Sequence, residues 1–571
     1  MKGSDFIQIL LRSYGINKIY GVLGREAASI SFNADYSQDF ILVRNELTAG
    51  LAAIGASRLT GQPQACFSTL GPGVTHMATA IGTACQDRDP VLFFTAQLET
   101  QATDYNNAHQ CIDAVSVSRP ITKYSSEPTT LEQLAVAVDR AFSKMLTYPL
   151  GPALISLPID LLDMPVSDAN IAKWLSPESK PVKPTASAAY TTAIDYNIQK
   201  ACDLLATSKN PIIIVGDTVT KSPDAMSIKH SLEKINMPVI TTYSAKGLLP
   251  RDHSLYLGVI NSYLDVILEE FIQKDIFETV DTVFLLGYDM TEHYPNAWNH
   301  GERKKIISLN YFDNETSKSF IPDIKITGDI QAVLQKISEK IESRAVIHED
   351  MVRVHDKILN ALDKFMDEEP HKDSLSIPQI IKTLNTLFGP YDYIVANDIG
   401  THRHVTATFF APQAPHHYLT SAGFSSYGTG IGIAIGAAFA RPDKRIILIA
   451  GDGGFHSNSG DLETIIRYKL PITIIVANNN ANGLIKRYQL TGSSQHHQDL
   501  STTEFTHVDF VKLAEANGMQ AAKATSPQQL LDILNRHDPS LPILIEAPVY
   551  YHDLYINRYA KSWNGNKPTI R

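Results

Sequence analysis

Apolar residues in this chain occur in short runs that alternate with segments of helical spacing. In the N-terminal third, runs such as KIYGVLG, DFILVRN and PVLFFTAQ are rich in β-branched or aromatic residues, and glycine or proline closes most of them. Short, continuous apolar runs bounded by turn residues predict buried strands of a parallel sheet. With helical segments between the strands, the pattern predicts a doubly wound α/β domain.

The same alternation occurs three times, which predicts an α/β protein of three domains, each with a doubly wound parallel sheet. We place the first domain at 1–165 and the second at 193–345, with a polar, proline-bearing linker at 166–192 between them. A charged helical segment at 346–375 is predicted to link the second domain to the third, which takes 376–571 and includes a C-terminal segment.

The most informative pattern lies in the third domain, at 445–489. An apolar run there ends in GDGG at 451–454, a helical segment follows, and a second apolar run leads to Asn479. Glycines let the backbone approach a ligand closely, and the start of a helix presents N–H groups that suit a diphosphate. Because Asp452 and Asn479 follow neighbouring strands, their oxygens can meet at one Mg²⁺ ion. The pattern predicts a Mg²⁺-diphosphate site, although a glycine turn alone can also be a packing feature.

Composition favours an enzyme that acts on small molecules. The 571 residues are 44% hydrophobic, which is enough for several cores. A net charge of −10 gives no indication of binding to nucleic acid or to an anionic membrane. No apolar run approaches the length of a membrane span, and the start MKGSDFIQILLRSYG lacks the features of a signal peptide. We therefore expect a cytoplasmic protein.

Four cysteines occur in the chain, and their spacing matches neither a zinc site nor a disulfide framework. The simplest prediction is that they are free thiols in a reducing compartment. They are Cys66, Cys85, Cys111 and Cys202.

A carboxylate also follows a predicted strand in the first domain, in the segment RNELTAG at 44–50. Glu46 opens a helical segment, AGLAAIGASRL, whose alanines and glycines allow close packing. An acid at the start of a helix is favourable by itself, because it faces the positive end of the helix dipole. The residue type therefore leaves open a structural or a catalytic role.

The arrangement of strand, GDG, helix, strand and Asn-Asn resembles the cofactor motif of thiamine diphosphate enzymes. Over the whole chain, the domain order resembles the acetolactate synthase and pyruvate oxidase group, in which a pyrimidine-binding domain comes first, a central domain second and a diphosphate-binding domain last. The resemblance implies thiamine diphosphate and Mg²⁺ as cofactors. It also implies that the first domain of one subunit and the third domain of another build each site, so that we expect a homodimer at least and a homotetramer by preference.

The resemblance also implies roles for individual residues. Glu46 is the carboxyl that hydrogen-bonds N1′ of the cofactor pyrimidine, so that the 4′-imino group can take the proton from C2. The main-chain oxygen of Ser425 receives the 4′-amino group, and Tyr427 stands where the family has a bulky wedge under the cofactor. The implied Mg²⁺ ligands are Asp452, Asn479 and the Ala481 carbonyl, and the other implied cofactor contacts are Gly451, Asp452, Gly453, Gly454, Asn479, Gly483, Leu484 and Ile485.

Several segments resemble a narrower family, the N2-(2-carboxyethyl)arginine synthases, which open the biosynthesis of the antibiotic-related clavulanic acid. They include GVLGREAAS, NNAHQCIDAV, TTYSAKGLLP, LTSAGFSSYGTG and NGLIKRYQ. Two differences from acetolactate synthases favour the narrower family. His109 precedes Gln110 where those enzymes typically have Phe, and Arg487-Tyr488 stands where they have Gln-Trp.

This narrower resemblance implies a transferase that joins a three-carbon unit from glyceraldehyde 3-phosphate to the α-amino group of arginine or a related amino acid. Two alternatives stay open: a 2-oxo acid carboligase or decarboxylase of the acetolactate synthase type, and a non-catalytic cofactor-binding subunit. His109 and Gln110 are the implied catalytic proton shuttle, and Arg403 can bind a phosphate with its guanidinium fork. The implied substrate contacts are His109, Gln110, Asp289, Arg403, His404 and Tyr551.

Three of these substrate contacts also have a plain interpretation. His109 can be an ordinary surface histidine. Arg403 can belong to a surface salt bridge, and Asp289 can be an acid at the end of a strand with no chemical role.

Overall fold

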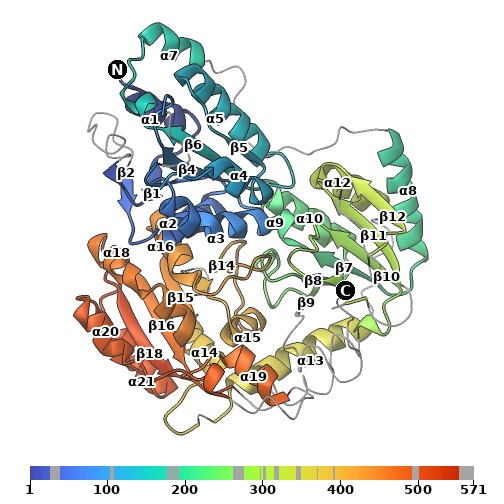
Figure 1. Cartoon of the computed structure of the whole chain (residues 1–571). Coiled ribbons are helices and arrows are strands. Elements are labelled where there is room, and N and C mark those ends of the chain that lie inside the picture. The colour runs from blue at the N-terminus through green and yellow to red at the C-terminus, as the bar shows by residue number, and fades with distance from the viewer. Residues whose placement is uncertain are drawn as a thin grey trace. The chain divides into compact units, whose positions relative to one another are not determined.

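Three sheets of six parallel strands organise the chain, as the computed structural model in Figure 1 shows. Helices alternate with many of the strands in each domain, although β8 to β12 follow one another without an intervening helix among the described residues, and the predicted fold class of three doubly wound α/β domains is confirmed. The structure describes residues 1–25, 39–102, 108–175, 184, 192–260, 276–295, 298–299, 304–313, 320–341, 349–369, 371–389, 392–491 and 500–551.

The first sheet has the strand order β2-β1-β3-β4-β6-β5. Its strands are β1 (Lys18–Gly21), β2 (Asp39–Leu42), β3 (Gln64–Ser68), β4 (Val91–Gln97), β5 (Tyr124–Ser126) and β6 (Ala153–Pro158). The accompanying helices are α1 (Gly3–Ser13), α2 (Glu46–Thr60), α3 (Pro72–Gln86), α4 (Ala114–Ser118), α5 (Leu131–Met145), α6 (Asp160–Asp163) and α7 (Asp168–Trp174).

The second sheet has the order β12-β11-β10-β7-β8-β9, which is the order of a dinucleotide-binding fold read from its far edge. Its strands are β7 (Pro211–Val215), β8 (Val239–Thr241), β9 (Tyr256–Val259), β10 (Thr282–Leu286), β11 (Lys305–Asn310) and β12 (Ile324–Thr327). The helices are α8 (Thr192–Thr207), α9 (Asp217–Thr220), α10 (Ala225–Ile235), α12 (Ile330–Ile341) and α13 (Glu349–Met366).

The third sheet has the order β14-β13-β15-β16-β18-β17. Its strands are β13 (Tyr393–Asn397), β14 (Tyr418–Leu419), β15 (Arg445–Gly451), β16 (Ile472–Asn478), β17 (Gln520–Lys523) and β18 (Ile543–Pro548). Its helices are α14 (Ile377–Leu387), α15 (Thr401–Phe409), α16 (Gly430–Ala440), α17 (Asp452–Ser457), α18 (Leu462–Arg467), α19 (Gly483–Thr491), α20 (Phe510–Ala516) and α21 (Pro527–Arg536).

The chain forms two compact units, and their boundaries do not follow the sequence in order. The first unit takes 1–187 together with two segments of the third domain, 423–442 and 458–468. The second unit takes 188–422, 443–457 and 469–571. Helices α16 and α18 are therefore part of the first unit, although their sequence lies beside that of the third sheet.

Glycines allow α16 to pack against α2 inside the first unit. A Cβ added at Gly436 would lie 1.9 Å from the carbonyl oxygen of Ala52, and one added at Gly55 would lie 2.3 Å from that of Ile433. The backbones of the two helices are therefore in direct contact, and only glycine fits at these two positions. The alanines and glycines of the predicted helix after Glu46 serve this contact.

Two sequence expectations are also checked by the fold. All four cysteines are free thiols, as predicted. Among the residues that the structure describes, no helix is long and apolar enough to cross a membrane.

Candidate functional site

Helix α2 begins at Glu46 because Asn45 caps it. The Asn45 side chain accepts a hydrogen bond of 2.8 Å from the backbone N–H of Thr48, and Asn45 itself has an extended backbone. Although Glu46 is the first helical residue, it is only 7% exposed. Its Oε2 lies 3.1 Å from Nδ1 of His76 on α3. The first unit thus holds the predicted catalytic carboxyl in a largely buried position.

Asp461 fixes the turn that carries Glu46. It is fully buried, and its carboxylate accepts hydrogen bonds from the Arg44 backbone N–H at 2.9 Å and from the Thr48 hydroxyl at 2.6 Å. Burial raises the pKa of Asp461, while these hydrogen bonds act in the opposite direction. The sequence analysis missed this residue, because its own segment, GDLETI, shows only an acid near the start of a helix.

A second buried carboxylate holds the loop that carries Ser425 and Tyr427. Oδ1 of Asp87 accepts from the backbone N–H groups of Gly423 at 2.6 Å and Phe424 at 3.2 Å. The other carboxylate oxygen of Asp87 accepts from Arg58 at 2.8 Å. Ser425 follows with a left-handed φ of 53°, and the Tyr427 side chain is exposed. Asp87 therefore helps to set the loop that is predicted to contact the cofactor, and no local pattern around Asp87 indicates this role.

His109 and Gln110, the predicted proton shuttle, are both exposed in the first unit. Gln110 has a left-handed φ of 59°, and a Cβ added at Gly71 would lie 2.0 Å from its carbonyl oxygen. This close approach places the Gln110 backbone beside the start of α3. In the described part of the chain, no hydrogen bond joins either residue to Glu46, so a joint catalytic role stays a prediction.

In the second unit, the glycine turn ends β15 as predicted. Strands β15 and β16 are paired with Gly451 opposite Ala477, which brings Asp452 and Asn479 to the same edge of the sheet. Oδ2 of Asp452 accepts a hydrogen bond of 3.1 Å from the backbone N–H of Ala481. Burial raises the pKa of Asp452 to about 6, although several backbone N–H groups act in the opposite direction. A divalent cation would compensate this buried carboxylate.

Gly483 lets α19 start directly against Asn479. A Cβ added at Gly483 would lie 2.7 Å from Nδ2 of Asn479 and 3.6 Å from the hydroxyl of Thr401. Leu484 is partly buried and Ile485 is exposed in the first turn of the helix. The described residues contain no cluster of three His, Cys, Asp or Glu side chains that could hold a metal. The donors present fit the predicted set for Mg²⁺, in which a single carboxylate is completed by amide, carbonyl and phosphate oxygens.

His402 lies against the glycine turn. A Cβ at Gly451 would meet its ring at 3.1 Å, and one at Gly400 would meet it at 2.8 Å. Burial, with the Arg403 charge as a second cause, lowers the pKa of His402 to about 3, so the imidazole is neutral. Among the residues that the structure describes, its Nε2 has no hydrogen-bond partner. This ring nitrogen lies beside the predicted diphosphate site, although His402 was not among the predicted site residues.

Those neighbours, Arg403 and His404, form a buried cluster around Tyr243. The Tyr243 hydroxyl lies 2.9 Å from Nδ1 of His404, and the His293 ring meets the Tyr243 ring edge-on at 4.8 Å. Nη1 of Arg403 donates to the carbonyl of Ser421 at 2.7 Å. Burial and the Arg403 charge hold the pKa of His404 well below its usual range. The cluster thus combines one buried cation with neutral imidazoles.

Two predicted substrate contacts lie elsewhere in the second unit. Asp289 is buried after β10 and accepts a hydrogen bond of 2.9 Å from the N–H of Thr291. Tyr551 is partly buried, and its pKa is raised by burial and then by the Asp452 carboxylate. Tyr551 is therefore electrostatically coupled to the glycine turn, whereas nothing described connects Asp289 with it.

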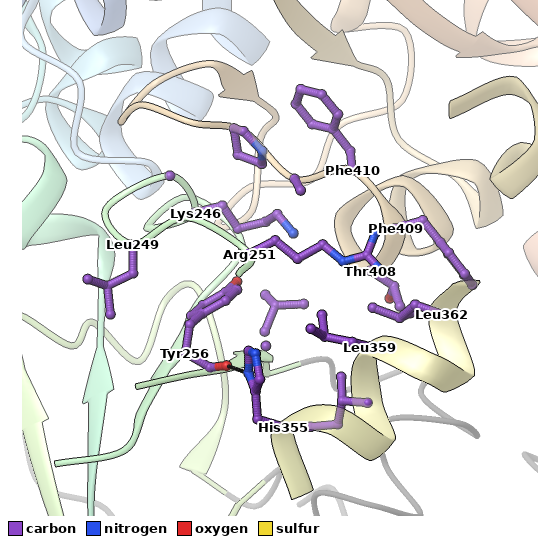
Figure 2. Close-up of a pocket in the computed structure, with 16 residues that line it drawn as sticks. Lys246, Leu249, Arg251, Tyr256, His355, Leu359, Leu362, Thr408, Phe409 and Phe410 are labelled. Carbon is purple, nitrogen blue, oxygen red and sulfur yellow. Dashed lines mark hydrogen bonds between the residues drawn. The ribbon is translucent and has the colours of Figure 1, made fainter. Parts of the chain in front are cut away.

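A small cavity of about 20 Å³ lies in the second unit, and none of the predicted site residues lines it. Figure 2 shows the residues that do line it. Its lining is mostly apolar and comes from the second domain, α13 and the end of α15. Lys246 donates to the Ala407 carbonyl, and His355 is 2.7 Å from the Tyr256 carbonyl oxygen. Because its volume suits about one water molecule, we regard it as a packing feature.

Three protein-family models match the chain in succession. Residues 1–117 match the thiamine pyrophosphate enzyme N-terminal TPP binding domain, residues 198–337 the central domain, and residues 398–546 the C-terminal TPP binding domain. The matched segments fall within the three α/β domains.

Curated relatives match over nearly the whole chain. An acetolactate synthase of Bacillus subtilis is 28% identical, with 97% of this chain and 94% of the relative covered. A probable acetolactate synthase large subunit of Methanocaldococcus jannaschii is 30% identical, covering 94% of this chain and 89% of the relative. The large subunit of acetolactate synthase isozyme 3 from Escherichia coli is 25% identical, covering 93% and 91%.

These relatives overturn the narrower functional prediction. The sequence analysis favoured a carboxyethylarginine synthase that uses glyceraldehyde 3-phosphate and arginine, and that prediction is wrong. The similar proteins are named acetolactate synthase and match from end to end. The narrower prediction rested on short segments and on the differences at His109 and Arg487-Tyr488, whereas the broader family matches nearly the whole chain.

Proposed function

The chain belongs to the thiamine diphosphate-dependent enzymes of the acetolactate synthase family, and on that premise we propose that it is a 2-oxo acid carboligase. It would decarboxylate one 2-oxo acid and join the remaining fragment to a second. The observation that carries this proposal is the match to acetolactate synthases over more than nine-tenths of the chain. The buried Glu46 and the glycine turn at Asp452 support it.

The cofactor is thiamine diphosphate, for which Mg²⁺ is the usual partner ion. When bound, thiamine diphosphate supplies the nucleophilic carbon and the electron sink that decarboxylation needs. Asp452, Asn479 and the Ala481 carbonyl would hold the cation, and the His402 ring would lie beside the diphosphate. The cation ligands are all oxygen atoms, as a hard cation prefers.

Proton handling would fall to the first unit. Glu46 would hold a proton at N1′ of the cofactor pyrimidine, and its low exposure supports this role because water does not compete strongly for the carboxyl. The main-chain oxygen of Ser425 would accept from the 4′-amino group, with Tyr427 under the rings. His109 and Gln110 remain candidates for contact with the substrate.

The substrate carboxylate would bind to the Tyr243 cluster. Arg403 is a buried guanidinium, and a carboxylate accepts two parallel hydrogen bonds from such a fork. His404 beside it is a neutral hydrogen-bonding group. A 2-oxo acid needs such a cation for its carboxylate, and decarboxylation then removes the charge that the site binds.

The first test is product analysis. Purified protein with thiamine diphosphate, Mg²⁺ and pyruvate should release carbon dioxide and form acetolactate, detected by mass spectrometry, and Glu46→Gln should abolish both. A panel of other 2-oxo acids then maps the acceptor. If no 2-oxo acid in the panel is consumed while the cofactor binds, the carboligase proposal fails.

We further propose that Glu46 and Asp452 of different subunits complete one site. Co-expression of Glu46→Gln with Asp452→Ala tests this directly. In a mixed dimer with shared sites, one site contains both native residues and regains activity, whereas sites built within one chain stay inactive. Each variant expressed alone is the control.

A further inference from the structure

Glu46 has a hydrogen-bonded neighbour that no sequence argument assigned. Nδ1 of His76 lies 3.1 Å from Oε2 of Glu46. The Glu46 side chain is 10% exposed, whereas that of His76 is 67% exposed. Within one chain, the pair therefore has one buried end, at the predicted catalytic carboxyl, and one end that is mostly exposed.

Helix packing fixes this pair. A Cβ added at Gly50 on α2 would lie 2.4 Å from the Cβ of Ala80 on α3, so the two helices touch at that point. Gly50 lies four residues after Glu46, and Ala80 lies four residues after His76. Residues four apart share one face of a helix, so both side chains stand one turn before the point of closest approach. The hydrogen bond thus follows from the backbone packing of two helices.

The other polar and charged groups near the start of α2 form hydrogen bonds or ion pairs with one another. Asp461 accepts hydrogen bonds from the Arg44 backbone and from the Thr48 hydroxyl. The Arg44 guanidinium lies 4.0 Å from Glu463. Among the described residues, the titratable side chain hydrogen-bonded to the Glu46 carboxyl is that of His76.

We propose that His76 relays protons between Glu46 and water, and so acts as a positioning residue for the thiamine chemistry. This inference rests on the proposed cofactor role of Glu46. In one direction the O–H bond at Oε2 breaks and an N–H bond forms at Nδ1, after which the Nε2–H bond breaks and its proton passes to water. The reverse sequence reprotonates the carboxyl, and no electrons are exchanged.

The physical need for such a relay follows from burial. A carboxyl that must gain and lose a proton during cofactor activation exchanges slowly if water cannot reach it. Imidazole suits the task because it binds and releases protons near neutral pH and has a nitrogen on each side of its ring. His76 supplies that ring with one nitrogen on Glu46 and most of its surface exposed.

The experiment measures hydrogen–deuterium exchange at C2 of bound thiamine diphosphate by acid quench and NMR, together with the cofactor Kd. In His76→Gln, exchange should fall about tenfold or more while Kd changes less than about twofold. Added imidazole should restore exchange in His76→Ala, in a manner that depends on its concentration.

The matched control is His230→Gln on α10. His230 is a similarly exposed histidine, at 69%, and its Nδ1 lies 3.7 Å from the more exposed carboxylate of Glu233, far from α2 in sequence. This variant should leave exchange and Kd unchanged. Unchanged exchange in both His76 variants overturns the proposal, and so does a loss that imidazole does not restore. Because the assay contains no 2-oxo acid, its result is separate from the fate of the carboligase proposal.

Discussion

The first and third sheets share one topology but carry different chemistry. If strands are numbered within each domain, both sheets read 2-1-3-4-6-5. In the first, the acid Glu46 follows the second strand, and the glycine turn after the third strand contains no acid. In the third, Asp452 lies inside the turn after the third strand. Two copies of one scaffold thus differ in which strand end carries a carboxylate, and function resides in those positions rather than in the fold.

Burial also has different consequences for these two carboxylates. Burial raises the pKa of Asp452 to about 6, and the acid faces the backbone N–H of Ala481. Glu46 instead meets a titratable side chain, His76, at 3.1 Å. The third domain presents a negative charge that a cation can neutralise, whereas the first domain presents a carboxyl that can exchange a proton with a neighbouring side chain. We therefore expect the two acids to affect different measured quantities.

The largest expected effect is that of Glu46→Gln on turnover. An amide keeps the size of the side chain but cannot exchange a proton, so kcat should fall by about 10²–10⁴-fold. Steady-state kinetics measure this, and fluorescence titration should show a thiamine diphosphate Kd within a few-fold of the native value. A comparable loss of cofactor affinity would contradict the proposal that Glu46 serves turnover while Asp452 serves cofactor binding.

Asp452→Ala should have the next largest effect, on binding. Loss of the single carboxylate ligand should weaken Mg²⁺-dependent binding of thiamine diphosphate by about 100-fold, as calorimetry can measure. Asp538→Ala, an exposed acid of the same domain, is the control and should bind normally. If Asp452→Ala binds the cofactor as tightly as the native protein, the predicted metal site is wrong.

Gly436→Ala tests the helix contact that belongs to the first unit. The added Cβ would lie 1.9 Å from the Ala52 carbonyl oxygen, and the resulting overpacking should lower the free energy of unfolding by about 2–3 kcal/mol. Chemical denaturation measures this change in the free energy of unfolding. Gly460→Ala is the matched control, since a Cβ there meets no atom within 4 Å, and equal losses in the two variants would argue against the contact.

Asp461→Asn should have the smallest effect, about 1 kcal/mol, because the amide nitrogen faces donors that the carboxylate satisfied. Burial raises the pKa of Asp461 in the folded protein. The stability that its protonated form contributes is present at acid pH and is lost as pH rises through the folded pKa. The stability advantage of the native protein over the variant should therefore narrow with rising pH, as thermal unfolding at several pH values can show.

Local pattern was enough to predict the strands and the residues that end them. Asp452 and Asn479 follow consecutive apolar runs, and parallel pairing then brings both to one edge. The start of α2 at Glu46 was also readable from the change of period after DFILVRN. These features depend on neighbouring residues, so a single sequence contains them.

Local sequence pattern could not predict the residues that complete the site. Asp461 binds the Arg44 turn across 417 positions of sequence, and Asp87 binds Gly423 across 336. His76 meets Glu46 only because two helices touch at Gly50. Spacing cannot connect such pairs, since their contact depends on tertiary packing. For substrate choice, the same limit let a few short segments and two single differences outweigh the match of the whole chain.

The hydrogen bond between the Arg44 N–H and Asp461 also affects the order in which the protein folds during synthesis. The Glu46 turn leaves the ribosome early, yet its carboxylate acceptor follows 417 residues later, which takes roughly 20–80 s at ordinary rates of synthesis. During that time the first domain can form its strands, but the Arg44 N–H and the Thr48 hydroxyl await their acceptor. Helix α16, which packs against α2, also arrives late in synthesis. The catalytic half of the first domain is therefore completed only after most of the chain has been synthesised, although its sequence comes first.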